Sequence, residues 1–191
     1  MIATLPAPLS TETRPRSSVE KLSFVGQELA ERFRVIYSAA FAPLETLAPV
    51  RQGLTDSEFL DQMFDPSVIK FVAWDEDGEP AALAFMATDL SKVPWISVPY
   101  FQARFPEHFA RGAIYYFGAL LVSPAHKGGP WASRVLRAAN RAVMAARAIA
   151  VFDCCEHNVS RKLPDFIARI ASWMTPVELE AQRYYALVPP A

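Results

Sequence analysis

The sequence predicts a mixed α/β domain in which helices pack on a central β-sheet. Apolar runs of strand length alternate along the chain with segments of helical periodicity. The Asp77-Gly78 pair between two of these runs predicts a hairpin turn, because glycine supplies the positive φ that such a turn requires. A chain of 191 residues with 52% hydrophobic residues can bury one sizeable core. The expected order is strand, helices, hairpin, strand, helix, strand, helix, strand.

The chain begins with residues 1–20, which we interpret as a flexible N-terminal arm. The first 18 residues are rich in Pro, Ser and Thr and lack the sustained apolar core of a secretory signal. A short strand is predicted at Lys21–Gly26. A helix follows, whose apolar residues keep the i, i+3, i+4, i+7, i+8 spacing of a core-facing stripe: Phe33, Ile36, Tyr37, Ala40 and Phe41.

The segment from Thr55 to Glu58 has the pattern of a capping box, in which the Thr55 hydroxyl and the Glu58 carboxylate each bind the other residue's backbone amide. A short helix should follow, with Phe59, Leu60, Met63 and Phe64 facing inward. The hairpin comes next, with strands predicted at Ile69–Trp74 and Ala81–Thr88.

The segment Ser91–Gly112 is crowded with prolines and aromatic residues and shows no regular periodicity. Long structured connections tend to carry function or to cover something. Two interpretations stay open: a surface excursion that tucks its aromatic side chains onto the core, and a lid or wall over an acceptor pocket.

The strand predicted at Ile114–Val122 is nearly continuous in apolar residues, as expected for burial on both faces. It runs through a Gly-rich turn into a helix with Val135, Leu136, Ala139 and Val143 inward. The unpaired amides and the dipole at a helix start favour an anion, and Arg134 or Arg137 could assist. With a net charge of -1 the chain has no general attraction for nucleic acid, so we expect a small-molecule phosphate ligand.

The last predicted elements are a strand at Ile149–Cys154, a helix at Ser160–Ala171 and a final strand region at Val177–Val188, before a tail at 189–191. We find no internal repeat or linker and therefore expect one domain over 21–188. The longest apolar runs fall well short of the roughly 20 residues of a membrane span.

The two cysteines, Cys154 and Cys155, are adjacent, and a disulfide between neighbours is strained. They favour a reducing, cytoplasmic location. Strand alternation turns them to opposite faces, so with His157 they do not make a set of four convergent ligands, and we expect no metal site.

The turn also carries a family signature. The layout Val-x-Pro-x-x-(Gln/Arg)-x-x-Gly-x-(Gly/Ala), read on Val122, Pro124, Lys127, Pro130 and Ala132, resembles the acyl-CoA pyrophosphate loop of the GNAT-type N-acetyltransferase superfamily. Here a lysine stands at the Gln/Arg position and a proline where the family usually has glycine. Together with the hairpin and an asparagine after the next strand, the resemblance spans Lys21–Val188.

The resemblance implies a mixed sheet of six or seven strands whose central parallel strands, Ile114–Val122 and Ile149–Cys154, splay apart and admit acyl-CoA. The pantetheine arm would pair with Leu120, Leu121 and Val122, and Asn158 would hydrogen-bond it. The pyrophosphate would lie on the loop amides, drawn from Lys127, Gly128, Gly129, Trp131, Ala132 and Ser133. The implied activity is transfer of an acetyl or longer acyl group from acyl-CoA to an amine of a small molecule or peptide, by direct attack.

The catalytic residues are less clear. Many relatives have a tyrosine acid seven residues after the asparagine, and that position is Asp165 here. The candidates are Tyr115, or its neighbour Tyr116, on the central strand; Glu156, or His157, at the mouth of the next; and His108, or Glu107, in the aromatic segment. A histidine can exchange a proton near neutral pH without a large pKa shift.

Two alternatives to this function stay open. Pro130 and the missing tyrosine are compatible with a non-catalytic GNAT-fold module that binds a ligand or a protein partner, and an acyl-carrier-protein thioester could replace acyl-CoA as donor. A homodimer formed through the final strand or the aromatic segment Trp95–Phe109 would be compatible with each.

Overall fold

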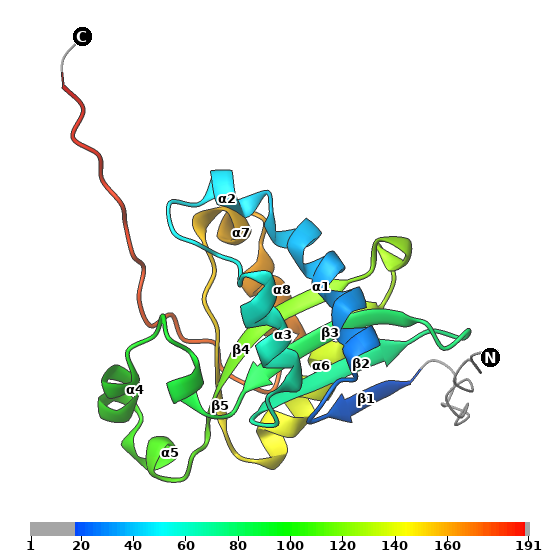
Figure 1. Ribbon diagram of the computed structural model, residues 1–191. Coiled ribbons are helices and arrows are strands. Elements are labelled where there is room, and N and C mark those ends of the chain that lie inside the picture. The colour runs from blue at the N-terminus through cyan, green and yellow to red at the C-terminus, as the bar shows by residue number, and fades with distance from the viewer. Residues whose placement is uncertain (1–17, 190–191) are drawn as a thin grey trace, which may run out of the picture.

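A computed structural model describes residues 18–189 of the protein. Its sheet has five strands in chain order, β1 (Val19–Leu22), β2 (Val68–Trp74), β3 (Pro80–Ala87), β4 (Ile114–Val122) and β5 (Ile149–Val151). Neighbouring strands are antiparallel from β1 to β4, and β4 and β5 are parallel. Figure 1 shows helices on both faces of this sheet, as the mixed α/β prediction requires.

The helices are mostly short. They are α1 (Gln27–Phe41), α2 (Leu44–Leu47), α3 (Asp56–Phe64), α4 (Val98–Arg104), α5 (Pro106–Ala110), α6 (Trp131–Ala145), α7 (Glu156–Ser160) and α8 (Leu163–Ile170). Single 3-10 turns lie at η1 (Leu90–Lys92) and η2 (Pro124–His126).

Two hydrophobic cores lie on the two faces of the sheet. On one face, α1 and α3 bury Phe33, Tyr37, Phe59 and Met63 against the strands. On the other face, α6 packs Val135, Ala139 and Val143 against β2 and β3. The two predicted apolar stripes are thus confirmed, except that Ala40 is exposed. With helices on each face, β2 and β3 are buried on both sides.

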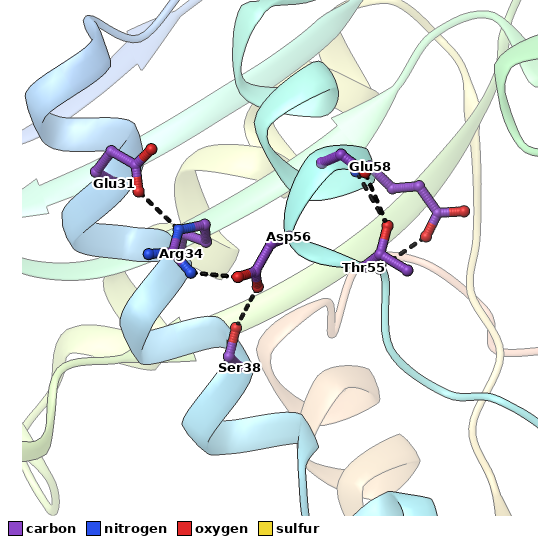
Figure 2. A network of polar contacts seen from close by, with 7 residues as sticks. Glu31, Arg34, Ser38, Thr55, Asp56 and Glu58 are labelled. Carbon is purple, nitrogen blue, oxygen red and sulfur yellow. Dashed lines mark hydrogen bonds and ion pairs between the residues drawn. The ribbon is translucent and has the colours of Figure 1, made fainter.

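Polar contacts join α1 to α3 at the surface of the first core (Figure 2). Asp56 accepts hydrogen bonds from Arg34 and, at 2.9 Å, from the Ser38 hydroxyl. Arg34 also donates to Glu31 at 2.6 Å. The capping box is confirmed: the Glu58 amide donates to the Thr55 hydroxyl at 3.3 Å, and the Thr55 amide to the Glu58 carboxylate at 2.7 Å.

The hairpin between β2 and β3 is confirmed, with strand ends within one residue of the prediction. Gly78 has φ +80° in its turn. The Asp75 carboxylate closes this turn, because it accepts the amides of Asp77 at 2.9 Å and Glu79 at 2.8 Å.

A β-bulge at Gly118 divides β4 into two halves. Phe85 pairs with Ala119 while its neighbour Met86 pairs with Phe117, so Gly118 is the extra residue. Before the bulge, Ile114 and Tyr116 face the first core; after it, Ala119 and Leu121 do. The ring of Phe85 lies over Gly118, where a Cβ would come within 2.3 Å of it.

The aromatic segment follows η1 and holds α4 and α5, and the two helices begin beside Pro99 and Pro106. Phe101 is buried, and Phe105 and Phe109 pack against the first core. The interpretation in which these rings cover the core is thus confirmed for part of the segment. Trp95 and Tyr100 are exceptions, since they remain 48% and 40% exposed, and Trp95 takes part in the site described below.

Several predicted boundaries were wrong. The first strand lies at Val19–Leu22 rather than Lys21–Gly26, because it pairs with β2 from Val19 to Leu22, so residues 19 and 20 belong to the sheet and not to the arm. The rest of the arm, 1–17, and the tail residues 190 and 191 lie outside the described residues. The helix expected at Ser160–Ala171 is α8, which begins three residues later than predicted; the short α7 before it was not predicted, and Lys162 between them has the left-handed conformation.

The largest correction concerns the C-terminal strands. Residues 177–188 form no strand, and the described residues form five strands rather than the six or seven implied by the resemblance. β5 ends at Val151 rather than Cys154, because its pairing with β4 stops there. Alternation in a sequence indicates a strand only if a partner strand is present to accept its hydrogen bonds.

Candidate functional site

The two parallel strands separate soon after they meet. β4 pairs with β5 only from Ile114–Ile149 to Tyr116–Val151, and β4 then continues alone to Val122 on that side. The chain after Val151 instead leaves the sheet and reaches α7 (Figure 1). We refer to this divergence between the second half of β4 and residues 152–155 as the opening.

The second half of β4 offers backbone groups to this opening. The Ser123 amide donates to the Ala81 carbonyl at 2.9 Å, so the backbone N–H and C=O groups of Ser123 point toward β3. By alternation, the backbone groups of Leu121 and Ala119 do the same. The backbone N–H and C=O groups of Leu120 and Val122 consequently face away from β3, toward the opening. An extended ligand with amide groups could pair with them as a further strand would.

The loop after β4 ends in an uncapped helix. Pro130 is the N-cap of α6 and contributes no N–H, and no side chain caps the helix. The amides of Trp131, Ala132 and Ser133 are the first three of the helix and have no intrahelical acceptor. Gly128, at φ +82°, gives the loop a turn that other residues adopt only with strain. Exposed Lys127 adds a positive charge.

Aromatic packing fixes the shape of this loop. The Trp131 ring lies so close to Gly129 that a Cβ there would come within 2.8 Å of it. The Arg134 guanidinium lies over the same ring, 4.7 Å from its centroid, and His126 meets it edge-on at 5.4 Å. The Arg134 Nη1 atom is buried and has no hydrogen-bond partner among the described residues. A loop with an unpaired guanidinium nitrogen and unpaired amides is suited to bind a phosphate.

His126 ties the loop to the hairpin. Its Nε2 atom lies 2.9 Å from the Asp75 carboxylate, the same group that closes the β2–β3 turn. Burial raises the pKa of Asp75, but the hydrogen bonds from the Glu79 amide, His126 and the Asp77 amide lower it by more. The pKa of Asp75 is therefore below its ordinary value. Asp75 thus remains ionised and anchors both segments.

A hydrogen-bonded chain of three side chains lies at the point where β4 and β5 separate. Trp95 donates its indole N–H to the Tyr116 oxygen at 2.7 Å, and the Tyr116 hydroxyl donates to the Asp153 carboxylate. Burial, and then the nearby Asp153 charge, raise the pKa of Tyr116 above its ordinary value, so the phenol keeps its proton. Tyr116 is buried, whereas Asp153 is exposed. The chain presents a carboxylate to solvent at the base of the opening.

The neighbouring cysteine is not an activated nucleophile. Burial, and then Asp153 and Cys155, raise the pKa of the Cys154 thiol to about 11. Both cysteines are free of disulfide bonds. Among residues 18–189, no three His, Cys, Asp or Glu side chains gather as metal ligands would, and no helix is long and apolar enough to span a membrane.

Solved structures share this architecture over nearly the whole chain. An aminoglycoside N-acetyltransferase in complex with CoA aligns with a TM-score of 0.52 and 14% identity, over 91% of this chain and 97% of its own. An aminoglycoside acetyltransferase from an uncultured soil metagenomic sample, in complex with sisomicin, has a TM-score of 0.52 and 13% identity, with 89% and 95% coverage. The protein has the GNAT fold.

The acetyltransferase likeness extends to another structure. YycN from Bacillus subtilis, described as a putative acetyltransferase, aligns with a TM-score of 0.54 at 8% identity, over 88% of this chain and 100% of its own. In contrast, no protein-family profile and no curated protein sequence matches the chain. At these identities the likeness establishes the GNAT fold, and the chemistry must be argued from the side chains.

Within the GNAT fold, the predicted cofactor residues lie on separate segments of the chain. Leu120, Leu121 and Val122 end β4, and Lys127 to Ser133 form the loop and the start of α6. Asn158 lies in α7, where its backbone amide donates to the Cys155 carbonyl at 2.9 Å. The order of the elements is that of the GNAT resemblance, with the sheet ending at β5.

The three predicted catalytic residues are dispersed. Tyr115 packs in the second core, on the α6 face of the sheet, whereas Tyr116 faces the first core. His108 lies in α5 and Glu156 begins α7, and Figure 1 shows these two helices at opposite ends of the molecule. Tyr116, weighed as an alternative, is the one that joins a polar chain at the opening.

Sequence reasoning missed Asp153 and the role of Trp95. Asp153 is separated from Tyr116 by 37 residues, and the contact depends on the register between β4 and β5. One signal was present: Asp153 is the first charged residue after a run of apolar strand residues, and carboxyl ends of parallel strands are where GNAT-like and other open sheets bind ligands.

Proposed function

We propose that the protein is an N-acyltransferase that moves an acetyl or longer acyl group from acyl-CoA to an amine of a small molecule or peptide. One observation carries the proposal: the free backbone edge of Leu120 and Val122 leads directly into an uncapped helix start with an unpaired arginine nitrogen. This combination suits an amide-containing arm that ends in a pyrophosphate.

The proposed donor site uses the chain from Leu120 to Arg134. The pantetheine amides pair with the backbone of Leu120 and Val122, beside Leu121. The backbone amides of Trp131, Ala132 and Ser133 donate hydrogen bonds to the pyrophosphate. Lys127 and Arg134 supply positive charge, and Gly128 and Gly129 let the backbone approach the ligand closely. Asn158 is proposed to bind the arm from the other side. The CoA bound to a structural neighbour supports this choice of donor.

The proposed reaction is direct attack of the amine on the thioester carbonyl. Asp153 accepts one proton from the ammonium, the neutral nitrogen forms a bond to the acyl carbon, and the C–S bond breaks. The departing thiolate then takes up the second proton, which the acylated nitrogen loses as the amide forms. Tyr116 and Trp95 act as positioning residues, because they hold the carboxylate in place. Tyr115, Glu156 and His108 remain proposed alternatives for proton transfer, and each can be tested by substitution.

The acceptor is proposed to approach over α4, α5 and the exposed ring of Trp95. The exposed carboxylates of Asp153 and Glu156 would attract a cationic amine. A neighbouring structure holds the aminoglycoside sisomicin, which is an amine. Because the two cysteines are free, we propose a cytoplasmic location.

Donor binding is tested by a thermal-shift titration with CoA, acetyl-CoA and a long-chain acyl-CoA. A ligand at 100 times its dissociation constant adds about 2.7 kcal/mol of stability, which raises the melting temperature visibly. We expect a rise for the wild type and a weaker one for Lys127→Glu. Lys21→Glu makes the same charge change at an exposed position on β1 and should match the wild type.

Turnover is then tested by thiol release from acyl-CoA with a panel of amines. Acylation above background in the wild type, abolished in Lys127→Glu, would support the proposed acyltransferase activity. Binding without turnover would favour the non-catalytic GNAT-fold module, which Pro130 at the N-cap also favours because it removes one amide from the cradle. Turnover only with an acyl-carrier-protein thioester would reassign the donor.

A further inference from the structure

A groove lies between α6 and the first strand of the sheet. It has a volume of about 310 Å³ and is lined by Val19, Lys21, Phe71, Ala138, Arg141 and Ala142. Phe71, which pairs with Lys21 across β1 and β2, is buried in the second core, so the floor of the groove is apolar. Lys21 and Arg141 are both exposed, one on β1 and the other on α6. The groove therefore combines an apolar floor with a cationic rim.

The positive charge of this rim has no acidic counterpart nearby. No ion pair among residues 18–189 includes Lys21 or Arg141. α6 has no acidic residue, and Arg137, one turn before Arg141, is also exposed. Glu20 on β1 accepts a hydrogen bond from the Trp74 indole at 3.1 Å and points to the opposite face of the sheet, because successive side chains of a strand alternate. The rim thus favours an anionic partner.

The strand beside the groove has backbone groups that point away from the sheet. The Trp74 amide donates to the Ser18 carbonyl at 2.9 Å, so the backbone groups of Ser18 point toward β2. By alternation, the N–H and C=O groups of Val19 and Lys21 point away from β2. β1 is an edge of the sheet, and residues 18–189 place no further strand beside it (Figure 1). Because the side chains of Val19 and Lys21 line the groove, the edge and the groove adjoin.

We propose that β1 and this groove bind an extended acidic peptide segment of a partner protein, which adds to the sheet as a strand beside β1. The peptide backbone pairs with Val19 and Lys21, and alternate peptide side chains project over the groove. An acidic side chain lies near Lys21 and Arg141, and an apolar one two residues along covers Phe71.

The three features together favour a peptide over other anions. A lipid carboxylate or a free phosphate could pair with the two cations, but it would leave the strand edge unused. A nucleic acid has no backbone amides with which to extend a sheet. The peptide site is independent of the proposed acyl transfer, since β1 is at the opposite edge of the sheet from β5 and the opening.

The first test is a fluorescence-anisotropy titration of the full-length protein. The probe is a fluorescein-labelled peptide of sequence Thr-Val-Glu-Thr-Leu-Thr, whose glutamate and leucine lie on the same face of a strand. We expect saturable binding. A peptide with lysine in place of the glutamate should bind at least about tenfold more weakly, because it meets like charges. A peptide methylated on the leucine nitrogen keeps every side chain but loses one backbone donor, and it should bind about tenfold more weakly as well.

Variants of the protein separate this site from the proposed donor site. Lys21→Glu and Arg141→Glu should each weaken peptide binding by about tenfold, whereas Arg183→Glu makes the same change at an exposed position elsewhere and should match the wild type. Val19→Pro removes an outward N–H without changing charge and should also weaken binding. Lys127→Glu should bind the peptide normally. Peptide binding by a protein that binds no acyl-CoA would support this site while refuting the proposed donor.

The second test locates the contact in the wild-type chain by hydrogen exchange of individual amides, measured by NMR. The Val19 and Lys21 amides should exchange rapidly in the free protein and become protected when the peptide is added. The Leu22 amide, which points toward β2, should be protected in both states. The proposal would be overturned by absence of binding, by equal binding of the lysine peptide or of a short DNA duplex, or by edge amides that are already protected in the free protein.

Discussion

The Tyr116 hydroxyl donates a hydrogen bond to the Asp153 carboxylate, and this contact joins β4 to the chain that leaves β5 where the two strands separate. Trp95 fixes the phenol from the other side through a 2.7 Å hydrogen bond. A buried phenol with a raised pKa thus holds an exposed carboxylate at the base of the opening.

The first prediction concerns this contact. Asp153→Asn keeps the shape of the side chain and removes the base, so we expect kcat to fall by about 10²- to 10⁴-fold, the usual range for a proton-transfer group. Tyr116→Phe should lower kcat less and change its pH profile, because the carboxylate stays but loses its hydrogen bond. Acyl-CoA binding, measured by thermal shift, should be unchanged in both.

The matched control is Asp61→Asn, at an exposed carboxylate on α3, which should keep wild-type kcat. Equal turnover by Asp153→Asn and the wild type would contradict the assignment and turn attention to Glu156, His108 and Tyr115.

The second prediction concerns the bulge. An alanine Cβ at position 118 would lie 2.3 Å from Cε2 and 2.8 Å from Cδ2 of Phe85, so Gly118→Ala should destabilise the fold by about 1–3 kcal/mol. Urea unfolding measures this loss. Gly26→Ala is the control for added volume, because no heavy atom outside its two chain neighbours lies within 4 Å of the position that its methyl group would take; any loss there reports the N-cap of α1. Adding Phe85→Leu should recover part of the loss in Gly118→Ala; no recovery would mean that another contact is responsible.

The third prediction concerns the start of α3. Thr55→Ala removes the hydroxyl that accepts the Glu58 amide, and we expect a loss of about 1 kcal/mol in the free energy of unfolding. Thr55→Ser retains the acceptor and should stay within a few tenths of a kcal/mol of the wild type. Equal losses in the two variants would show that the threonine methyl group, rather than the hydroxyl, stabilises this end of the helix.

The fourth prediction concerns the pH dependence of stability. Lys70 is fully buried, and its ammonium donates to the Ser23 carbonyl at 3.0 Å and the Asp65 carbonyl at 2.7 Å. Burial lowers the pKa of Lys70 from 10.5 to about 8. Between these values the unfolded chain binds more protons than the folded one, so this lysine makes stability rise with pH. Its destabilising effect is complete below pH 8 and is lost as pH rises to about 10.5.

Urea unfolding from pH 7 to pH 10 checks this sign. The stability of the wild type relative to Lys70→Met should increase across that range. Lys21→Met makes the same change at an exposed position and should leave the pH dependence close to that of the wild type. Parallel curves for the wild type and Lys70→Met would show that Lys70 titrates alike in both states.

The elements that could be predicted are those whose signals are local. The capping box of Thr55 and Glu58 and the Asp77-Gly78 turn each specify a backbone conformation through neighbouring residues. β4 was predicted with its observed bounds, because a continuous run of apolar residues is distinctive. The expected burial on both faces was only half right, since the residues on its α6 face are half-buried.

The features that could not be predicted depend on partners distant in sequence. Whether Val177–Val188 forms a strand depends on an available edge, and the shortness of β5 depends on where β4 diverges from it. The Tyr116–Asp153 contact likewise needs the strand register. The helices α4 and α5 were missed for a local reason, since Pro99 and Pro106 were taken as signs of irregularity although proline is also favoured in the first turn of a helix.

The bulge at Gly118 also keeps the two halves of β4 in phase. Because the bulge takes up this one additional residue, Val122 ends the strand with its side chain toward α6, while Ile114 and Tyr116 begin it on the opposite face. If the ladder paired Gly118 as an ordinary residue, with no bulge, one half of the strand would turn over relative to the other. Either the Tyr116 side chain would leave Asp153, or the backbone of Leu120 would turn toward β3 and the loop would depart from the wrong face for α6. The bulge thus couples the two sides of the opening.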